Sequence, residues 1–344
     1  MSAFSVLPFD IFERIVDTLS QDDTTLSSTK SCSLVCRDLL AICRTRIFAS
    51  IVLNNDYTKP PSTNFAWIQS GTSQQFERLM SLNPNLGAFI RDLEYQTIKQ
   101  DLKKPEGMIR SLRCVTRLRS LHLLNGASKH LFMWDNNVLR PALLQILHVP
   151  TLTTLSLFQI HRFLVEDLAP CVNLEKLKCY DVKATTPPSS AHARSFSPIQ
   201  FRDISFDGKS DGMARRMHAV CAGREPWVDI SRLSILSYTM KSGDSLKAFF
   251  NLLGQCHHLC SLNLDLSFEF FKQSFIGLAQ LLVPSAQTLK HLKVVSHFDG
   301  SFGRIDPFFG ITEELGKVVS HNVIEDIDLG ITYYTKAQTD PERQ

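Results

Sequence analysis

Apolar residues recur along this chain in a short pattern, apolar-x-x-apolar-x-apolar, at nearly even intervals. The copies begin at Phe48, Ile90, Leu118, Leu152, Leu174, Phe201, Ile230, Leu259, Leu289 and Ile324. From the second copy on, successive copies lie 28, 34, 22, 27, 29, 29, 30 and 35 residues apart. The last two apolar residues of a copy are two positions apart, so both point to one face of a strand. The pattern therefore predicts one short strand per copy.

A single strand of this kind cannot bury its apolar face alone, so neighbouring copies must stack into a parallel ladder. The spacing and the Leu-x-x-Leu-x-Leu core are similar to leucine-rich repeats, whose units run to roughly 20–29 residues. The resemblance implies an α/β fold in which a parallel strand ladder forms a curved solenoid with helices on its outer side. The alternative is an ordinary α/β domain in which an apolar-rich chain matches the pattern by chance.

The segments between the copies predict helices. Ser245–Leu253 begins after the candidate cap Asp244 and ends at Gly254, which are common signals for the start and the end of a helix. Helices are also expected at Val138–Leu147, Met213–Cys221, Phe271–Leu282 and Thr312–Val319. Residues 183–198 are rich in Pro, Ser and Ala, replace the helix of one copy, and predict a mobile loop.

The beginning of the chain predicts a separate helical module. Pro8 suits the first position of a helix, where its missing N–H group costs nothing. Ile11, Ile15 and Leu19 then follow four residues apart, on one helix face. A polar turn leads to a second helix, expected from Leu26 to about Arg44. A module of this size is too small to bury a good core alone, so it needs a partner or the repeats to lean on.

This stretch resembles an F-box. The matching residues are Leu7-Pro8-x-Asp10-Ile11, Ile15 and Leu19, then Ser33-Leu34-Val35-Cys36-Arg37 and Ile47-Phe48. The family implies docking on the Skp adaptor of a Skp–cullin–F-box ubiquitin ligase, which leaves the repeats to bind a protein substrate. By position, the residues that would contact the adaptor are Leu7, Pro8, Ile11, Ile15, Leu34, Val35 and Arg37. Many family members carry a Trp soon after Val-Cys-Arg, and this chain has leucines there. The alternative is that these helices only cap the open edge of the repeats.

In the repeat arrangement, residues that alternate with the buried ones face away from the helices, on the concave side of the ladder. Most of this face is polar and mixed in sign. It carries one basic and aromatic spot, formed by Phe158, Lys176, Lys178 and Tyr180. Aromatic side chains beside lysines suit a protein interface, so these four are the candidate substrate-binding residues. The alternative is an ordinary solvated sheet face.

Two stretches carry residues typical of catalysis or metal binding. Gly208-Lys209-Ser210-Asp211-Gly212 matches the Gly-x-Ser-x-Gly motif of serine hydrolases, but the strand before it is more polar than a buried central strand should be. The run Cys256-His257-His258-Leu259-Cys260 lacks the second ligand pair that structural zinc needs. We therefore expect no enzyme activity, no metal and no cofactor, with hydrolysis through Ser210 as a remote alternative.

Composition narrows the partners and the compartment. The 344 residues are 44% hydrophobic and 21% charged, with a formal net charge of +3. Such a mild charge does not predict nucleic-acid binding, and no apolar run is long enough to predict a membrane span. The beginning of the chain lacks the basic region of a signal peptide, and nine cysteines without paired spacing favour a reducing compartment. The expected location is the cytoplasm or the nucleus.

Together these observations predict four parts: an F-box helical module at 1–50, a connecting helical segment at 51–85, the leucine-rich-repeat solenoid at 86–335, and a flexible tail at 336–344. The leading hypothesis for the function is the substrate-recognition subunit of a ubiquitin ligase, which acts in ubiquitin-dependent degradation. The alternative is a leucine-rich-repeat scaffold without a ligase role.

Overall fold

The structure is a computed structural model, and it forms two compact units. The first comprises Met1–Phe132 and Asn136–Thr153, and the second comprises Met133–Asp135 and Thr154–Gln344. The residues that it describes are 9–22, 26–53, 69–97, 99–125, 133–185, 197–223, 226–267, 274–299, 308, 310–318 and 323–334.

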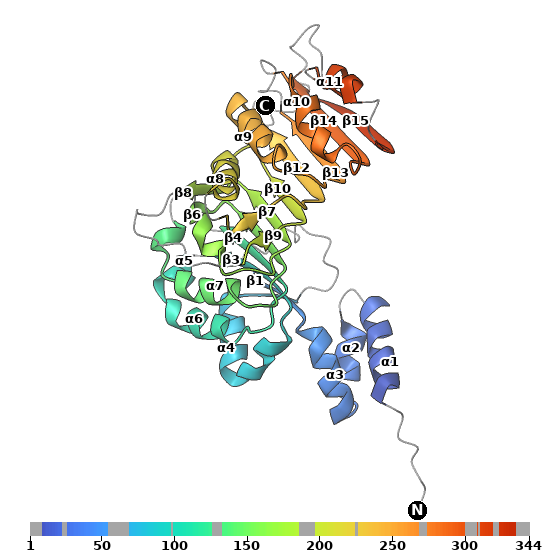
Figure 1. Cartoon of the computed structure of the whole chain (residues 1–344). Coiled ribbons are helices and arrows are strands. Elements are labelled where there is room, and N and C mark those ends of the chain that lie inside the picture. Colours follow the sequence, from blue (N-terminus) through green and yellow to red (C-terminus); the bar gives the residue numbers. More distant parts are fainter. Residues whose placement is uncertain are drawn as a thin grey trace, which may run out of the picture. The chain divides into compact units, whose positions relative to one another are not determined.

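Three helices open the first unit: α1 (Phe9–Asp22), α2 (Ser27–Cys32) and α3 (Arg37–Ile47). They pack against one another and form a small group in Figure 1. The expectation of one continuous helix from Leu26 to Arg44 is wrong, because a turn at residues 33–35 separates α2 from α3. The chain ends α2 with tight backbone hydrogen bonds and then extends at Cys36, where φ is −155°, before α3 begins. Pro8 lies outside the described residues.

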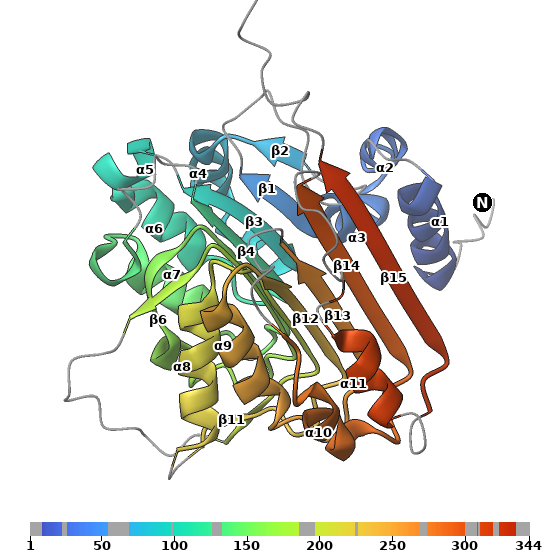
Figure 2. The same cartoon turned by 90° about the horizontal axis from the view of Figure 1, so that it is seen from above.

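The rest of the first unit is a parallel sheet flanked by helices. Its strands are β1 (Ser50–Leu53), β2 (Gln69–Gly71), β3 (Asp92–Thr97) and β4 (Ser120–Asn125), in the order β2-β1-β3-β4. Its helices are α4 (Ser73–Leu82), the short 3-10 helix η1 (Pro84–Phe89), α5 (Lys99–Lys103), α6 (Pro105–Arg113) and α7 (Arg140–Leu147). α6 packs between α4 and α7 (Figures 1 and 2). The 51–85 segment, expected to be helical, therefore contains β2 as well as α4.

The second unit continues the same alternation of strand and helix. Its main sheet is parallel, in the order β5 (Thr154–Phe158), β7 (Lys176–Tyr180), β10 (Asp203–Phe206), β12 (Ile235–Met240), β13 (Ser261–Leu266), β14 (His291–Asp299) and β15 (Asp326–Tyr334). Two short parallel pairs join β6 (His161–Leu164) to β8 (Lys183–Thr185) and β9 (Ile199–Gln200) to β11 (Val228–Asp229). The last three strands of the main sheet run side by side in Figure 2.

The helices of the second unit pack against one another and against its strands. They are α8 (Asp211–Cys221), α9 (Gly243–Leu253), α10 (Leu278–Leu282) and α11 (Ile311–Val318), with short 3-10 helices η2 (Trp134–Asn136), η3 (Val165–Leu168) and η5 (Val283–Ser285). α8 packs on α9, and α9 packs on β12 (Figure 1). Four of the five helices expected from the sequence are present with bounds shifted by one to two residues.

The fifth expected helix, Phe271–Leu282, is much shorter than predicted. Residues 274–277 form an irregular turn, and α10 begins only after Gly277, whose φ is +93°. That left-handed conformation favours glycine and interrupts a helix. The loop expected at 183–198 also begins differently, because its first three residues form β8. Residues 186–196 lie outside the described part of the chain.

The apolar residues of neighbouring copies pair in register. Leu155 lies opposite Leu177, and Leu262 lies opposite Leu292, with each of these side chains buried. One copy was assigned three residues too early. Leu236, and not Leu233, lies opposite Leu262, so the copy that begins at Ile230 in the sequence pattern begins at Leu233 in the structure.

The physical reason for this error is that two alignments satisfy the same pattern. Ile230 is buried because it fills the position three residues before the first leucine of the copy, as Cys171 and Cys256 do in theirs. Ile235, predicted to point into the core, is 37% exposed on the opposite face. The residues that alternate outward at the start of this strand are therefore Ile235 and Ser237.

The chain thus has a mixed α/β fold built on parallel strands, as the pattern predicted. The core lies between the strands and the helices, where the paired leucines of the copies are buried. In the part of the chain that the structure describes, no helix has both the length and the apolar character needed to cross a membrane.

Candidate functional site

The three N-terminal helices leave several apolar side chains in solvent. Ile11 and Ile15 on α1 are 37% and 41% exposed, and Leu34 and Val35, in the turn before α3, are 85% and 73% exposed. Arg37, the first residue of α3, is also exposed. We call these five residues the helical-module patch. Leu7 and Pro8, which the sequence placed with them, lie outside the described residues.

A separate set of residues holds the module together. Val16, Leu39, Ile42, Cys43 and Ile47 form its buried core, against which Phe12, Cys32 and Phe48 pack. An ion pair of 2.6 Å between Arg46 and Asp17 joins α3 to α1. Burial, with the neighbouring Cys32 adding to it, raises the pKa of Cys43 to about 11. The patch residues are therefore not needed to complete the core, and the sequence did not separate these two groups.

The four residues proposed on the sheet face come from two adjacent strands of the second unit. Phe158 ends β5 and Tyr180 ends β7, and the two residues are paired across the strands. Their rings stack with centroids 4.7 Å apart and an interplanar angle of 8°. Lys178 lies opposite Ser156, and Lys176 lies opposite Thr154. The structure thus brings the four predicted residues together on the face that points away from the buried leucines; we call them the β5–β7 patch.

The lysines of this patch lack an ion pair that Lys293, elsewhere on the sheet, has. Lys178 and Lys293 lie in one cross-strand row, which runs through the register of β10, β12 and β13, so they project from equivalent positions. Lys293 forms an ion pair of 2.9 Å with Asp328. Neither Lys176 nor Lys178 forms an ion pair with any residue that the structure describes. The positive charge of the β5–β7 patch is therefore not neutralised within the described chain.

One residue of this region was not predicted. Ser156 is 1% exposed, and its hydroxyl has no hydrogen-bond partner among the described residues. It lies on β5 between two core leucines in sequence, and its side chain is on the same face as Phe158 and opposite Lys178. A buried hydroxyl without a partner costs stability, so its presence here calls for an explanation. A lone Ser in an alternating strand gives no sequence signal of this kind.

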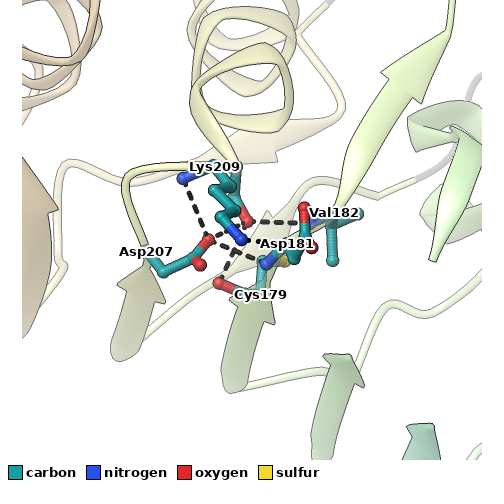
Figure 3. A network of polar contacts seen from close by, with 6 residues as sticks. Cys179, Asp181, Val182, Asp207 and Lys209 are labelled. Atoms are coloured by element: carbon teal, nitrogen blue, oxygen red, sulfur yellow. Dashed lines mark hydrogen bonds and ion pairs between the residues drawn. The ribbon is translucent and has the colours of Figure 1, made fainter. Parts of the chain in front are cut away.

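Ser210, the candidate nucleophile, is buried at the C-terminal ends of β7 and β10. Its hydroxyl accepts from the backbone N–H of Val182 at 3.0 Å, and its single proton is shared between a carboxylate oxygen of Asp207 at 2.6 Å and the carbonyl of Cys179 at 3.2 Å. Figure 3 shows the network at the two strand ends, with its partners Cys179, Val182 and Asp207 labelled. Ser210 is fully buried, and a nucleophile must reach its substrate. This arrangement makes Ser210 a connector between two neighbouring loops.

The same network supports the β5–β7 patch. The Asp207 carboxylate also accepts the backbone N–H of Asp181 at 2.8 Å (Figure 3). Asp181 follows Tyr180 directly and has a φ of +54°, a left-handed conformation that a residue other than Gly adopts at some cost. Gln159, which follows Phe158, has the same conformation and donates its N–H to the carbonyl of Tyr180 at 2.7 Å. Both aromatic residues are thus fixed at turns that leave the sheet.

Other candidate chemistry is not assembled. No group of three or more His, Cys, Asp or Glu side chains that could hold a metal occurs among the described residues. Cys256 is buried, with its thiol donating to the carbonyl of Leu252, while His257 and His258 are exposed. Burial raises the pKa of Cys256 to about 12, so this thiol stays protonated at neutral pH.

A comparison with protein-family models matches none of them, and a search of curated proteins finds no relative.

Proposed function

We propose that this chain is the substrate-recognition subunit of a Skp–cullin–F-box ubiquitin ligase, with the three N-terminal helices as its F-box and the strand–helix units as a leucine-rich-repeat solenoid. In this proposal the chain has no catalytic role. The cytoplasm or the nucleus is then its place of action.

The exposed apolar side chains of the helical-module patch carry the proposal. A helical module with its own buried core has no internal reason to keep Leu34 and Val35 more than two-thirds exposed. Large apolar side chains that one small module leaves in solvent are typical of a protein interface. These residues are also the ones that the F-box resemblance assigns to the Skp adaptor. Pure capping of the strand ladder would instead bury them against the chain.

Support for the substrate side comes from the β5–β7 patch. A stacked aromatic pair beside unpaired lysines has the composition of an interface centre, where aromatic anchors contribute most of the binding free energy. This patch lies in the second unit, whereas the residues assigned to the adaptor lie in the first.

The experiment is co-purification of the full chain with the Skp adaptor. We expect Leu34→Asp and Ile15→Asp to reduce adaptor recovery by at least about tenfold, because a buried carboxylate would replace an apolar contact. The matched control is Ile276→Asp, since Ile276 is 77% exposed in the second unit and its substitution should leave adaptor recovery unchanged. Each variant is first checked for an unchanged unfolding midpoint.

Two results would contradict the proposal. One is equal recovery of the adaptor with the Leu34 and Ile15 variants and with wild type. The other is full recovery after deletion of residues 1–50. In either case the N-terminal helices would only cap the repeats, and the scaffold without a ligase role would be the better explanation.

A further inference from the structure

We propose that the β5–β7 patch binds an acidic, extended segment of a partner protein, with a carboxylate side chain at Lys176 and Lys178 and a neighbouring aromatic or apolar side chain on the Phe158–Tyr180 stack. The inference deepens the proposed function, because it names the chemical class of the substrate segment. It rests on that function only in taking the bound protein to be a ligase substrate.

The first step is the charge of the site. Lys293 occupies the position equivalent to Lys178 in the sheet and is neutralised by Asp328. At the β14–β15 end of this face, the described lysine therefore has an acidic partner, which lies opposite it in register. Lys176 and Lys178 have none in the described chain, and the acid nearest in register, Asp203 on β10, forms no ion pair with Lys176. The missing partner is an anion.

The second step is the unsatisfied hydroxyl of Ser156. It lies directly opposite Lys178 in the strand pair, and its oxygen has no partner in the described chain. A carboxylate oxygen bound at Lys178 is an acceptor of the kind that this hydroxyl lacks. Because Ser156 is 1% exposed, the side chains that cover it must shift when the ligand binds. Burying a hydroxyl without a hydrogen bond costs stability, and a ligand that supplies the acceptor recovers that cost on binding. Ser156 is thus better explained by a ligand than by folding.

The third step is the shape of the aromatic pair. Phe158 and Tyr180 are partly exposed, and their stacked rings present a broad apolar surface next to two cations. A polypeptide with an acidic residue and a nearby aromatic or apolar residue matches both halves of this surface. A nucleic acid would also meet the cations and rings, but nucleic-acid binders usually carry a basic stripe, and this patch offers two lysines on one strand.

The test uses the full chain and a fluorescently labelled poly-glutamate peptide with one central phenylalanine, followed by anisotropy. We expect binding that weakens with added salt, and a roughly tenfold loss of affinity for Lys176→Gln/Lys178→Gln and for Phe158→Ala/Tyr180→Ala. Lys293→Gln is the matched control: it removes a positive charge from the same row of the same face, and it should leave the affinity within about twofold because that charge is already paired.

Ser156→Ala separates a binding role from a structural one. Removal of an unsatisfied hydroxyl should leave the free energy of unfolding unchanged or slightly higher, while peptide affinity falls. The proposal is overturned if the lysine and aromatic variants bind the peptide like wild type, if Lys293→Gln weakens binding as much as they do, or if a single-stranded oligouridylate displaces the peptide at lower concentration than unlabelled peptide does. Because the chain is tested without the Skp adaptor, peptide binding and adaptor recovery can fail independently.

Discussion

At the scale of single residues, a side chain can match a catalytic motif and have a different physical role. Ser210 stands in Gly-x-Ser-x-Gly, yet its hydroxyl is occupied by three partners and is inaccessible to solvent. Its hydrogen bonds join the turn after β10 to the turn after β7. Because Asp207 accepts both this hydroxyl and the N–H of Asp181, the network also holds the backbone directly after Tyr180.

The substitution Ser210→Ala should therefore lower the free energy of unfolding by about 1–3 kcal/mol, because it leaves the buried N–H of Val182 without its acceptor and removes one of the donors to the Asp207 carboxylate. Urea unfolding of the two proteins measures the difference. Ser205→Ala, on the outward face of β10, is the control and should change stability by less than about 0.5 kcal/mol. Equal stability of Ser210→Ala and wild type, or labelling of Ser210 by a serine-reactive fluorophosphonate, would contradict this role.

At the scale of elements, most strands could be predicted from the sequence, because the alternation of apolar and polar residues indicates that one face of each strand is buried. The strands of Leu118, Leu152 and Leu259 were placed in the correct register, since apolar and polar residues alternate there without ambiguity. The copy near Ile230 was misplaced because Ile230 and Ile235 are apolar as well. Ile230 is buried although it lies in the turn before the strand. Ile235 is exposed because, in the register that the structure shows, its side chain points to the outer face of the sheet.

Helix boundaries and the candidate site show where sequence information ends. The break between α2 and α3 depends on the extended backbone at Cys36, which no residue type there demands. Composition identified Lys178 and Tyr180, but their significance depends on the stack with Phe158 and on the absence of an ion pair within the described chain. Both depend on which strands are neighbours in the sheet, and residues far apart in the sequence decide that. The isolation of the Ser156 hydroxyl has the same origin.

The last strand, β15, exposes the apolar face that its neighbours bury. Ile327, Leu329 and Ile331 are 51%, 41% and 40% exposed, whereas their register partners on β14, which are Leu292, Val294 and Ser296, are buried. β15 also ends the strand order, so one of its edges has no partner strand in the described part of the chain. An apolar edge strand is a template for association with other chains.

Replacing Ile327 and Ile331 by Thr should therefore reduce aggregation on mild heating, followed by light scattering, while the free energy of unfolding falls by less than about 1 kcal/mol because both side chains are already half exposed. Leu292→Thr is the contrasting variant: the same kind of change in a buried position should cost about 2 kcal/mol or more and increase scattering. If the Ile327 and Ile331 variant aggregates like wild type, the edge is not the site of association.

At the scale of the whole molecule, the two proposed interfaces belong to different compact units. The helical-module patch lies in the first unit, and the β5–β7 patch lies in the second. In the proposed solenoid each strand–helix unit would contact only its neighbours, so stability and local structure would depend mainly on nearest-neighbour packing. Substitutions in one patch should then leave binding at the other unchanged.

This separation predicts that the acidic peptide binds the chain with the same affinity whether or not the Skp adaptor is present at saturating concentration. Coupling between two ligands requires that one of them favours a state of the chain that the other binds differently, and the two patches share no residue through which such a preference would act directly. We expect dissociation constants within about twofold of each other in anisotropy titrations, and additive losses when Leu34→Asp is combined with Lys176→Gln/Lys178→Gln. A tenfold change on adaptor binding corresponds to about 1.4 kcal/mol of coupling and would mean that the two units change conformation together.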